Sequence, residues 1–339
     1  KEVRIAYASI LLEKRQLREA KQEFEQLLKL QTQQGLNLTE SLYSLGIITL
    51  ELGELDISES YFLRQLENSD KEQNLNSTYL SLAQVAGLRK DSDKADFWLS
   101  KVEKNEEKNA LWFNVQMRRA LLKAADGKIV EARQFLQNIA PEQVDEEVTI
   151  LQTEAQIMKN AGQNLESFVL LSTAVREHSN NPNLIYDFAM AAESIQRYTE
   201  MEAALKHLIN ISPNNASAYN ALGYSYADRN VQLDEALRLL EKANQLAPED
   251  PFILDSLAWI KYRLKLIPEA EQILRSAYKM RQDAEITTHL GEILWVQNKQ
   301  SEGKDLFLEA QKKDPNNALL KSTLQRLGIT LTNPGVAPK

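Results

Sequence analysis

One short stretch near the C-terminal end, DSLAWIKYRL at residues 255–264, combines acidic, aromatic and basic side chains within one helical pattern. Asp255, Trp259 and Tyr262 follow one another at spacings of four and three residues, so they share one face of a helix. Leucines and an alanine form a second, apolar face on the same helix. The apolar face predicts burial in a core, and the other face is therefore a candidate binding or catalytic surface.

A second stretch, HLGE at residues 289–292, could take part in a metal site or an acid–base pair. His289 and Glu292 lie three residues apart on one helix face, and Asp255 could join them. A metal site needs three or four convergent ligands, and the chain has only three histidines, the others being His178 and His207. We therefore expect no metal ion, and we interpret these residues as a hydrogen-bond network.

The rest of the sequence argues against catalysis and against nucleic-acid binding. There is no glycine-rich phosphate loop and no nucleophile elbow, and the 339 residues include no cysteine. The net charge of −8 is the opposite of what a general DNA or RNA binder needs. No apolar run reaches the roughly 18 residues of a membrane span. We expect neither a cofactor nor catalytic residues in this chain.

Small residues recur along the whole chain at intervals of 33 to 38 residues. They are Ala8, Gly46, Ala83, Ala120, Ala155, Ala189, Gly223, Ala258 and Gly291. Large apolar residues follow each of them after 16 or 17 positions: Phe24, Phe62, Leu99, Leu136, Leu171, Leu205, Leu240, Leu274 and Phe307. A small residue lets two helices approach closely and a large one fills the space around it. The two columns predict nine helix hairpins.

This pattern resembles the tetratricopeptide repeat, a helix–turn–helix of about 34 residues. The best copy is AYNALGYSYADRNVQLDEALRLLEKANQLAPEDP, whose matching positions are Tyr219, Leu222, Gly223, Tyr226, Ala236, Leu240, Ala243 and Pro248. The resemblance implies an all-α fold, a right-handed superhelical α-solenoid of about nine repeats with a C-terminal capping helix. Asn181-Pro182 and Asp250-Pro251 are typical of helix starts, with an N-cap followed by proline.

The repeats divide the chain into four parts. Residues 1–147 are expected to hold about four divergent repeats, 148–317 five closer copies, 318–328 the capping helix and 329–339 a disordered tail. Arg119 and Glu154 occupy a position where the repeat has leucine. Either these two side chains pair across neighbouring repeats, or the repeat register differs there. Because the sequence opens on Lys1 rather than Met, we expect it to be a piece of a longer protein.

In tetratricopeptide arrays the first helix of each repeat lines the concave surface, and this resemblance implies a partner-binding groove. Its predicted residues are Tyr186, Met190, Asn220, Tyr224, Asp255, Trp259, Tyr262, Arg263, His289, Glu292 and Trp295. Aromatic and arginine side chains are enriched at binding hot spots. The alternative is that some of these rings pack on a neighbouring repeat or on the capping helix. Trp295 is the ring for which this alternative is most expected. An open groove predicts that Trp259→Ala costs less stability than Gly223→Leu.

Some arrays of this family clamp a chaperone's C-terminal carboxylate with paired asparagine and basic residues. The matching positions here hold Met190, Tyr224, Trp259 and Glu292. The clamp pattern is absent, and Glu292 would repel a carboxylate.

The last 120 or so residues are similar to proteobacterial outer-membrane lipoproteins built from these repeats. The resemblance lies in residues 220–228, 255–264 and 289–295. It implies a non-catalytic adaptor that binds a carboxyl-terminal processing protease and peptidoglycan hydrolases, in the periplasm, at the outer membrane through an N-terminal lipid anchor outside this chain. The alternative is a cytoplasmic scaffold or cochaperone that binds a short peptide.

Overall fold

The computed structural model describes residues 2–70, 73–104 and 109–331, which form nineteen helices and no strand. None of these helices is both long and apolar enough to span a bilayer. The chain divides into two compact units, residues 1–163 and 164–339. The boundary between these units follows from the contacts between helices. The predicted boundary at 147/148 is a different one, because it separates divergent repeats from repeats that match the sequence pattern closely.

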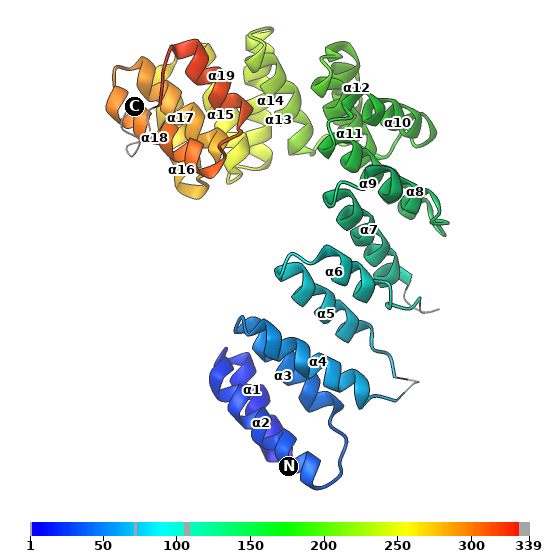
Figure 1. Ribbon diagram of the computed structural model, residues 1–339. Coiled ribbons are helices and arrows are strands. Elements are labelled where there is room, and N and C mark those ends of the chain that lie inside the picture. The colour runs from blue at the N-terminus through cyan, green and yellow to red at the C-terminus, as the bar shows by residue number, and fades with distance from the viewer. Residues whose placement is uncertain (1, 71–72, 105–108, 332–339) are drawn as a thin grey trace, which may run out of the picture. The chain divides into compact units, whose positions relative to one another are not determined.

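The N-terminal unit contains α1 to α9. The bounds are α1 Glu2–Glu13, α2 Leu17–Gln33, α3 Thr39–Glu51, α4 Leu55–Glu67, α5 Asn76–Leu88, α6 Ser92–Leu99, α7 Asn109–Ala125, α8 Ile129–Gln137 and α9 Val144–Asn160. Successive helices pack as hairpins, α1 with α2, α3 with α4, α5 with α6 and α7 with α8 (Figure 1).

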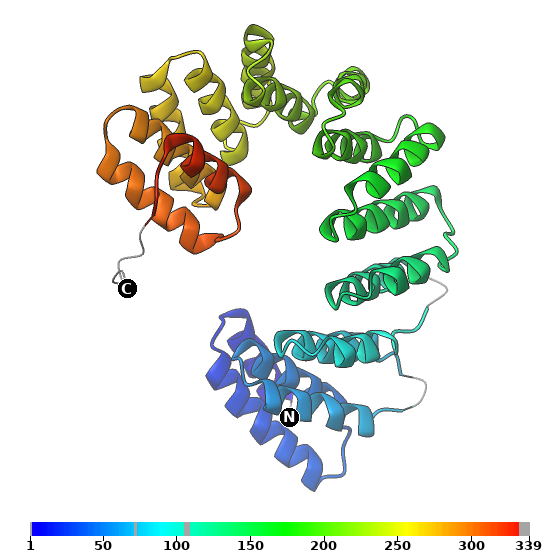
Figure 2. The ribbon, with the colours of Figure 1, turned by 45° about the horizontal axis from the view of Figure 1, so that its top comes forward.

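The C-terminal unit contains α10 to α19. The bounds are α10 Asn164–Glu177, α11 Pro182–Ser194, α12 Tyr198–Ile211, α13 Ala216–Asp228, α14 Leu233–Leu246, α15 Pro251–Arg263, α16 Ile267–Met280, α17 Ala284–Val296, α18 Gln300–Lys313 and α19 Ala318–Leu327. Four hairpins follow α10, and the first helices α13, α15 and α17 also contact one another in order. Figure 2 shows the succession of hairpins in this unit, ending in α19.

The two predicted columns form the core of both units. Every residue of the small column and every residue of the large column is buried. A Cβ atom added at Gly223 would lie 2.7 Å from Cγ of Leu240, and one at Gly46 would lie 2.5 Å from the ring of Phe62. Real Cβ atoms do not approach so closely, so the close packing at these two positions requires glycine. The predicted pairing of the two columns is confirmed at these positions.

The helix starts follow the sequence signals. The side chain of Asn181 accepts hydrogen bonds from the N–H groups of residues 183 and 184, and Asp250 does the same for residues 252 and 253. Pro182 and Pro251 occupy the first turn in each case. Proline has no N–H there to leave unsatisfied. Both predicted N-caps are confirmed.

Arg119 and Glu154 do not pair with each other. Arg119 Nε lies 2.7 Å from Asp96, and Glu154 accepts a hydrogen bond from Arg133 at 2.9 Å. Each of them instead contacts the second helix of the preceding repeat, α6 for Arg119 and α8 for Glu154. The first interpretation, a pair between the two, is wrong.

The capping helix is present as α19, which ends at Gly328 in the left-handed conformation (φ 66°). Ile329 and Leu331 then pack, partly buried, on a cluster that contains Phe307 and Leu320. The expected disorder is therefore wrong for residues 329–331, because two apolar side chains anchor them. Residues 332–339 lie outside the described part of the chain.

A candidate protein-binding face on the C-terminal unit

The predicted groove residues lie on the first helices of four successive repeats. We call this surface, on α11, α13, α15 and α17, the inner face of the C-terminal unit. It carries Tyr186 and Met190 on α11, Asn220 and Tyr224 on α13, Asp255, Trp259, Tyr262 and Arg263 on α15, and His289, Glu292 and Trp295 on α17.

Four of these residues are not on an open surface. Asp255, Trp259, His289 and Glu292 are 7%, 2%, 1% and 0% exposed. The expectation that they line an open groove is wrong. The physical reason is that α15 packs between α13 and α17, and α19 packs on α17, so side chains between neighbouring first helices are covered.

Trp259 is the centre of this buried group. The His289 ring stacks on it with 4.2 Å between ring centroids, and the Tyr262 ring lies at 5.1 Å. The guanidinium of Arg263 lies over the indole at 4.8 Å and donates a hydrogen bond of 2.9 Å to the carbonyl oxygen of Asp228. Such cation–π contacts favour a cation above the ring face. Trp259 is thus a packing residue that joins α13, α15 and α17.

Asp255 and His289 form a buried pair. His289 Nδ1 lies 2.9 Å from both carboxylate oxygens of Asp255. Burial lowers the pKa of His289, but the charges of Asp255, Glu292 and Glu285 together outweigh it, and the net pKa is raised. Neither His289 Nε2 nor Trp259 Nε1 has a hydrogen-bond partner in the described part of the chain. The interpretation of these residues as a hydrogen-bond network agrees with this geometry.

Glu292 connects the last repeat to the capping helix. Its carboxylate accepts hydrogen bonds of 2.8 and 2.7 Å from the two terminal nitrogens of Arg326 on α19. The Tyr262 hydroxyl donates a third, 3.0 Å long. Burial, together with Glu292, raises the pKa of Tyr262 to about 12. Bidentate pairs of this kind fix geometry as well as contributing energy. The buried carboxylate is therefore fully partnered.

The remaining predicted residues are half-buried. Trp295 packs against Phe307 and the α19 cluster, as the alternative interpretation expected. Tyr186, Met190, Asn220 and Tyr224 keep part of their surface open on α11 and α13. The accessible part of the predicted groove is therefore at α11 and α13, beside the buried Trp259 group.

Three acidic side chains border this accessible part. Glu193 lies at the end of α11, Asp228 at the end of α13 and Glu285 at the start of α17. Burial raises the pKa of Glu193 and of Glu285. Burial, with these carboxylates nearby, also raises the pKa of Tyr224. Helical spacing does place Glu193, three residues after Met190, on the same face of its helix, but the spacing within one helix gives no sign of Glu285.

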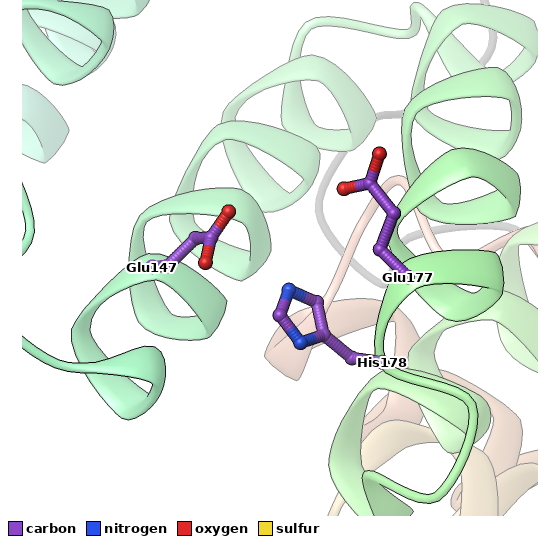
Figure 3. Close-up of side chains that lie close together, drawn as sticks. All are labelled: Glu147, Glu177 and His178. Atoms are coloured by element: carbon purple, nitrogen blue, oxygen red, sulfur yellow. The ribbon is translucent and has the colours of Figure 1, made fainter.

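Two of the three histidines are outside this face. His178 follows Glu177 at the C-terminal end of α10, and Glu147 lies on α9 (Figure 3). Because α9 and α10 belong to different units, we assign no metal site to these side chains. His207, on α12, lies 3.1 Å from the carbonyl oxygen of Ser179.

The comparisons with known proteins agree with the repeat architecture. The tetratricopeptide repeat model matches residues 2–34. A TPR repeat-containing protein of Pseudomonas aeruginosa is 34% identical over 220 residues, which is 64% of this chain and 36% of that protein. The protein O-mannosyl-transferase TMTC3 of Homo sapiens is 26% identical over 190 residues, 51% of this chain and 20% of that protein. The chain thus spans about a third or less of the length of these relatives.

Among solved structures, a tetratricopeptide repeat protein from Parabacteroides merdae has a TM-score of 0.56 at 15% identity. The match covers 75% of this chain and 98% of that one. The fold is therefore that of a tetratricopeptide-repeat α-solenoid, an architecture typical of protein-interaction scaffolds.

Proposed function

We propose that this chain is a non-catalytic scaffold that binds a protein partner through the accessible part of the inner face. The observation that carries the proposal is the set of half-buried side chains on two first helices, Tyr186 and Met190 on α11 and Asn220 and Tyr224 on α13, with the Tyr224 ring 6.4 Å from that of His289 in the buried Trp259 group. Aromatic residues held rigidly beside a packed core lose little entropy on binding. The Asp255–His289 pair is covered by Trp259, so the proposal gives it a structural role.

The finer proposal is an adaptor in the periplasm. It rests on the resemblance of residues 220–228, 255–264 and 289–295 to outer-membrane repeat lipoproteins, and it is compatible with the similarity to a repeat protein of P. aeruginosa. In this proposal the partners are a carboxyl-terminal processing protease and peptidoglycan hydrolases. A lipid anchor upstream of Lys1 would hold the scaffold at the outer membrane.

The test is an affinity capture from separate envelope and cytoplasmic extracts of the source organism, with partners identified by mass spectrometry. Wild type is compared with a Tyr186→Ala, Tyr224→Ala double variant. Trp259 is left intact because its removal would disturb the fold. The matched control is Phe252→Ala, Met280→Ala, which removes two exposed apolar side chains elsewhere on the same unit.

We expect an envelope protease or cell-wall hydrolase to be captured by wild type and by the control, and lost with the Tyr186, Tyr224 variant. Equal capture by all three proteins would place the binding surface elsewhere. Capture of cytoplasmic proteins alone would overturn the periplasmic proposal and favour the cytoplasmic alternative.

A further inference from the structure

One face of α1 differs from the same face of later first helices. Tyr7 and Ile10, one residue before and two residues after Ala8 of the small column, are 52% and 46% exposed. On α3, α5 and α17 the residues at these two positions are at most 1% exposed: Leu45 and Ile48, Leu82 and Val85, Leu290 and Ile293. We call Tyr7, Ile10 and Lys14 the α1 face. Its two apolar side chains are open to solvent at positions that these later repeats bury.

In the later repeats, the second helix of the preceding repeat covers these positions. Leu290 and Ile293 of α17 share a core cluster with Ala270 and Leu274 of α16. Ala270 is small and Leu274 is large, and their spacing of four residues places them on one stripe of the helix. The equivalent residues of α3 share a cluster with the same stripe of α2. The α1 face is therefore suited to a helix that carries a small residue followed by a large one.

Lys14 adds a charge to this face, six residues after Ala8. The residues at its position in three later repeats donate hydrogen bonds to an acidic residue of the preceding second helix: Arg89 to Glu59, Arg229 to Glu202 and Gln297 to Glu271, at 2.5, 2.9 and 2.8 Å. In each case the acidic residue lies three positions before the large residue of its helix. Lys14 is exposed and has no ion-pair partner among the residues that the structure describes. A helix bound to the α1 face would offer it an acidic residue at that position.

A charged pair lies beside the α1 face. Nε of Arg4 lies 3.1 Å from a carboxylate oxygen of Glu23, and both side chains line, with Tyr7, a cavity of about 510 Å³ between α1 and α2. In every later repeat the residue at the position of Glu23 is apolar or aromatic, for example Leu306. A permanent cover would bury the charged pair at a cost in free energy. Apolar side chains next to an ion pair are typical of a reversible interface with a separate partner.

We propose that the α1 face is a second interaction surface, which reversibly binds an amphipathic helix of a partner protein. The helix carries a small residue, an acidic residue directly after it and a large apolar residue three positions further. A second copy of this chain does not offer such a stripe in its described repeats, because both columns are buried and α19 covers Phe307. The proposal goes beyond the function of the inner face, which belongs to the other unit.

The test uses a fluorescein-labelled peptide with the sequence of residues 266–281, which contains Ala270, Glu271 and Leu274. A lactam bridge between its positions 272 and 276, which are exposed in α16, holds it helical. Fluorescence anisotropy compares its binding to wild type and to Tyr7→Gln, Ile10→Gln. The control is Ile57→Gln, Leu63→Gln, which removes two exposed apolar side chains from α4 of the same unit.

We expect the peptide to bind wild type and the control alike, and the Tyr7, Ile10 variant about tenfold more weakly. The peptide with Leu274→Gln should lose binding to wild type to a similar extent. No binding to wild type, or equal binding to all three proteins, would overturn the proposal. So would a dimer of wild type in analytical ultracentrifugation that the Tyr7, Ile10 variant does not form, because a second copy would then occupy the face.

A charge exchange tests the orientation of the bound helix. Lys14→Glu should weaken binding about threefold, and Glu271→Lys in the peptide should restore it. Lys29→Glu, the same change at an exposed position of α2, is the control and should bind both peptides alike. Weakening that Glu271→Lys does not restore, or that Lys29→Glu reproduces, would contradict the pairing of Lys14 with the acidic residue.

The same peptide separates this inference from the proposed function. The Tyr186→Ala, Tyr224→Ala variant should bind it as wild type does, because its substitutions lie on the inner face of the other unit. Loss of the peptide with this variant would place the peptide on the inner face and overturn the inference, while leaving the proposed function in place.

Discussion

At the residue scale, the buried pair of Asp255 and His289 shows how one charge controls the protonation of another. Burial alone would keep the imidazole neutral, but three acidic neighbours on α15 and α17 favour the imidazolium. His289 therefore holds its proton more strongly in the folded protein than in the unfolded chain. Folding and protonation of His289 are thermodynamically linked.

This linkage predicts a pH dependence of stability. Because the folded pKa of His289 lies above the unfolded value of about 6.5, its contribution is complete below that value and is lost as the pH rises through the folded pKa. We expect the urea midpoint of wild type to fall between about pH 6 and pH 9. His289→Gln should show a smaller fall. An identical fall in both proteins would mean that another group is responsible.

Trp259 gives the second prediction at this scale. Its side chain is 2% exposed and contacts His289, Tyr262 and Arg263, so Trp259→Ala should cost roughly 3–5 kcal/mol of unfolding free energy. That is at least as much as the roughly 1–3 kcal/mol for overpacking at Gly223→Leu, the reverse of what an open groove predicts. Tyr224→Ala is the control and should cost less. Denaturant titration of the three variants measures the order.

The spacing of residues in DSLAWIKYRL could predict which side chains share a face but not whether that face is open. Asp255, Trp259 and Tyr262 do project together. Their burial depends on α17 and α19, which lie about 30 to 70 residues further along the chain, and helical periodicity carries no information about those contacts. The sequence pattern therefore could not predict whether these side chains form a binding surface or a contact between repeats.

At the scale of elements, one column of charged residues joins successive repeats. It consists of residues on the second helices that lie three positions before a residue of the large column: Lys21, Glu59, Asp96, Arg133, Glu202 and Glu271. Each pairs with an oppositely charged residue of the next repeat, for example Arg133 with Glu154 at 2.9 Å and Glu202 with Arg229 at 2.9 Å. The sign of the charge varies between repeats, and Phe168 and Leu237 occupy the same position in two others, so a column defined by residue type could not reveal it.

Glu271 allows a prediction for this column. Burial raises its pKa, but the contacts with Lys299, Gln297 and Arg275 together outweigh burial and lower the pKa to about 2. A folded pKa below the unfolded value means that the contribution is present above about pH 4.5 and is lost as the pH falls toward 2. Glu271→Gln should lower stability at neutral pH by less than about 1 kcal/mol, since its partners Lys299 and Arg275 are 44% and 40% exposed and their charges are screened by solvent.

The same variant should also show less acid destabilisation than wild type, measured as the thermal midpoint between about pH 5 and pH 3. Glu249→Gln, an exposed glutamate outside the column, is the control. If the two variants lose stability in parallel with wild type, Glu271 makes no pH-dependent contribution.

The contact between α17 and α19 gives a further prediction. Glu292 is completely buried, whereas half of the Arg326 side chain is exposed. Arg326→Gln leaves a buried carboxylate with only the Tyr262 hydroxyl, so it should cost up to about 3–5 kcal/mol. Glu292→Gln should cost less, because an exposed guanidinium can be hydrated.

The double variant Glu292→Gln, Arg326→Gln should recover part of the loss caused by Arg326→Gln alone. A double-mutant cycle on the urea unfolding free energies measures this coupling. Additive losses would show that the two side chains contribute independently, and would contradict the role assigned to the pair.

At the scale of the whole molecule, the sequence was most informative where the repeats are most regular. Small and large columns predicted the cores of the hairpins within each unit, because the same steric requirement recurs in these repeats: Gly46 with Phe62 and Gly291 with Phe307 are two examples. The division at Gln163 could not be predicted, because it reflects how densely neighbouring repeats contact one another and not which residues each repeat contains.

This organisation predicts where a mutation is felt. In a repeat protein each repeat contacts its neighbours, so destabilisation acts mainly on the repeats nearby. Gly46→Leu forces a side chain against Phe62 in the N-terminal unit, and Gly223→Leu forces one against Leu240 in the C-terminal unit. Each should cost roughly 1–3 kcal/mol locally.

The tryptophans allow the two effects to be separated. Trp98 and Trp112 lie in the N-terminal unit, and Trp259 and Trp295 in the C-terminal unit. In a Trp98→Phe, Trp112→Phe background, fluorescence reports on the C-terminal unit while circular dichroism reports on all helices. We expect Gly223→Leu to shift the fluorescence midpoint in urea and Gly46→Leu to shift only the circular dichroism curve. Equal shifts of both signals by both variants would mean that the chain unfolds as one cooperative whole, against the local character of its contacts.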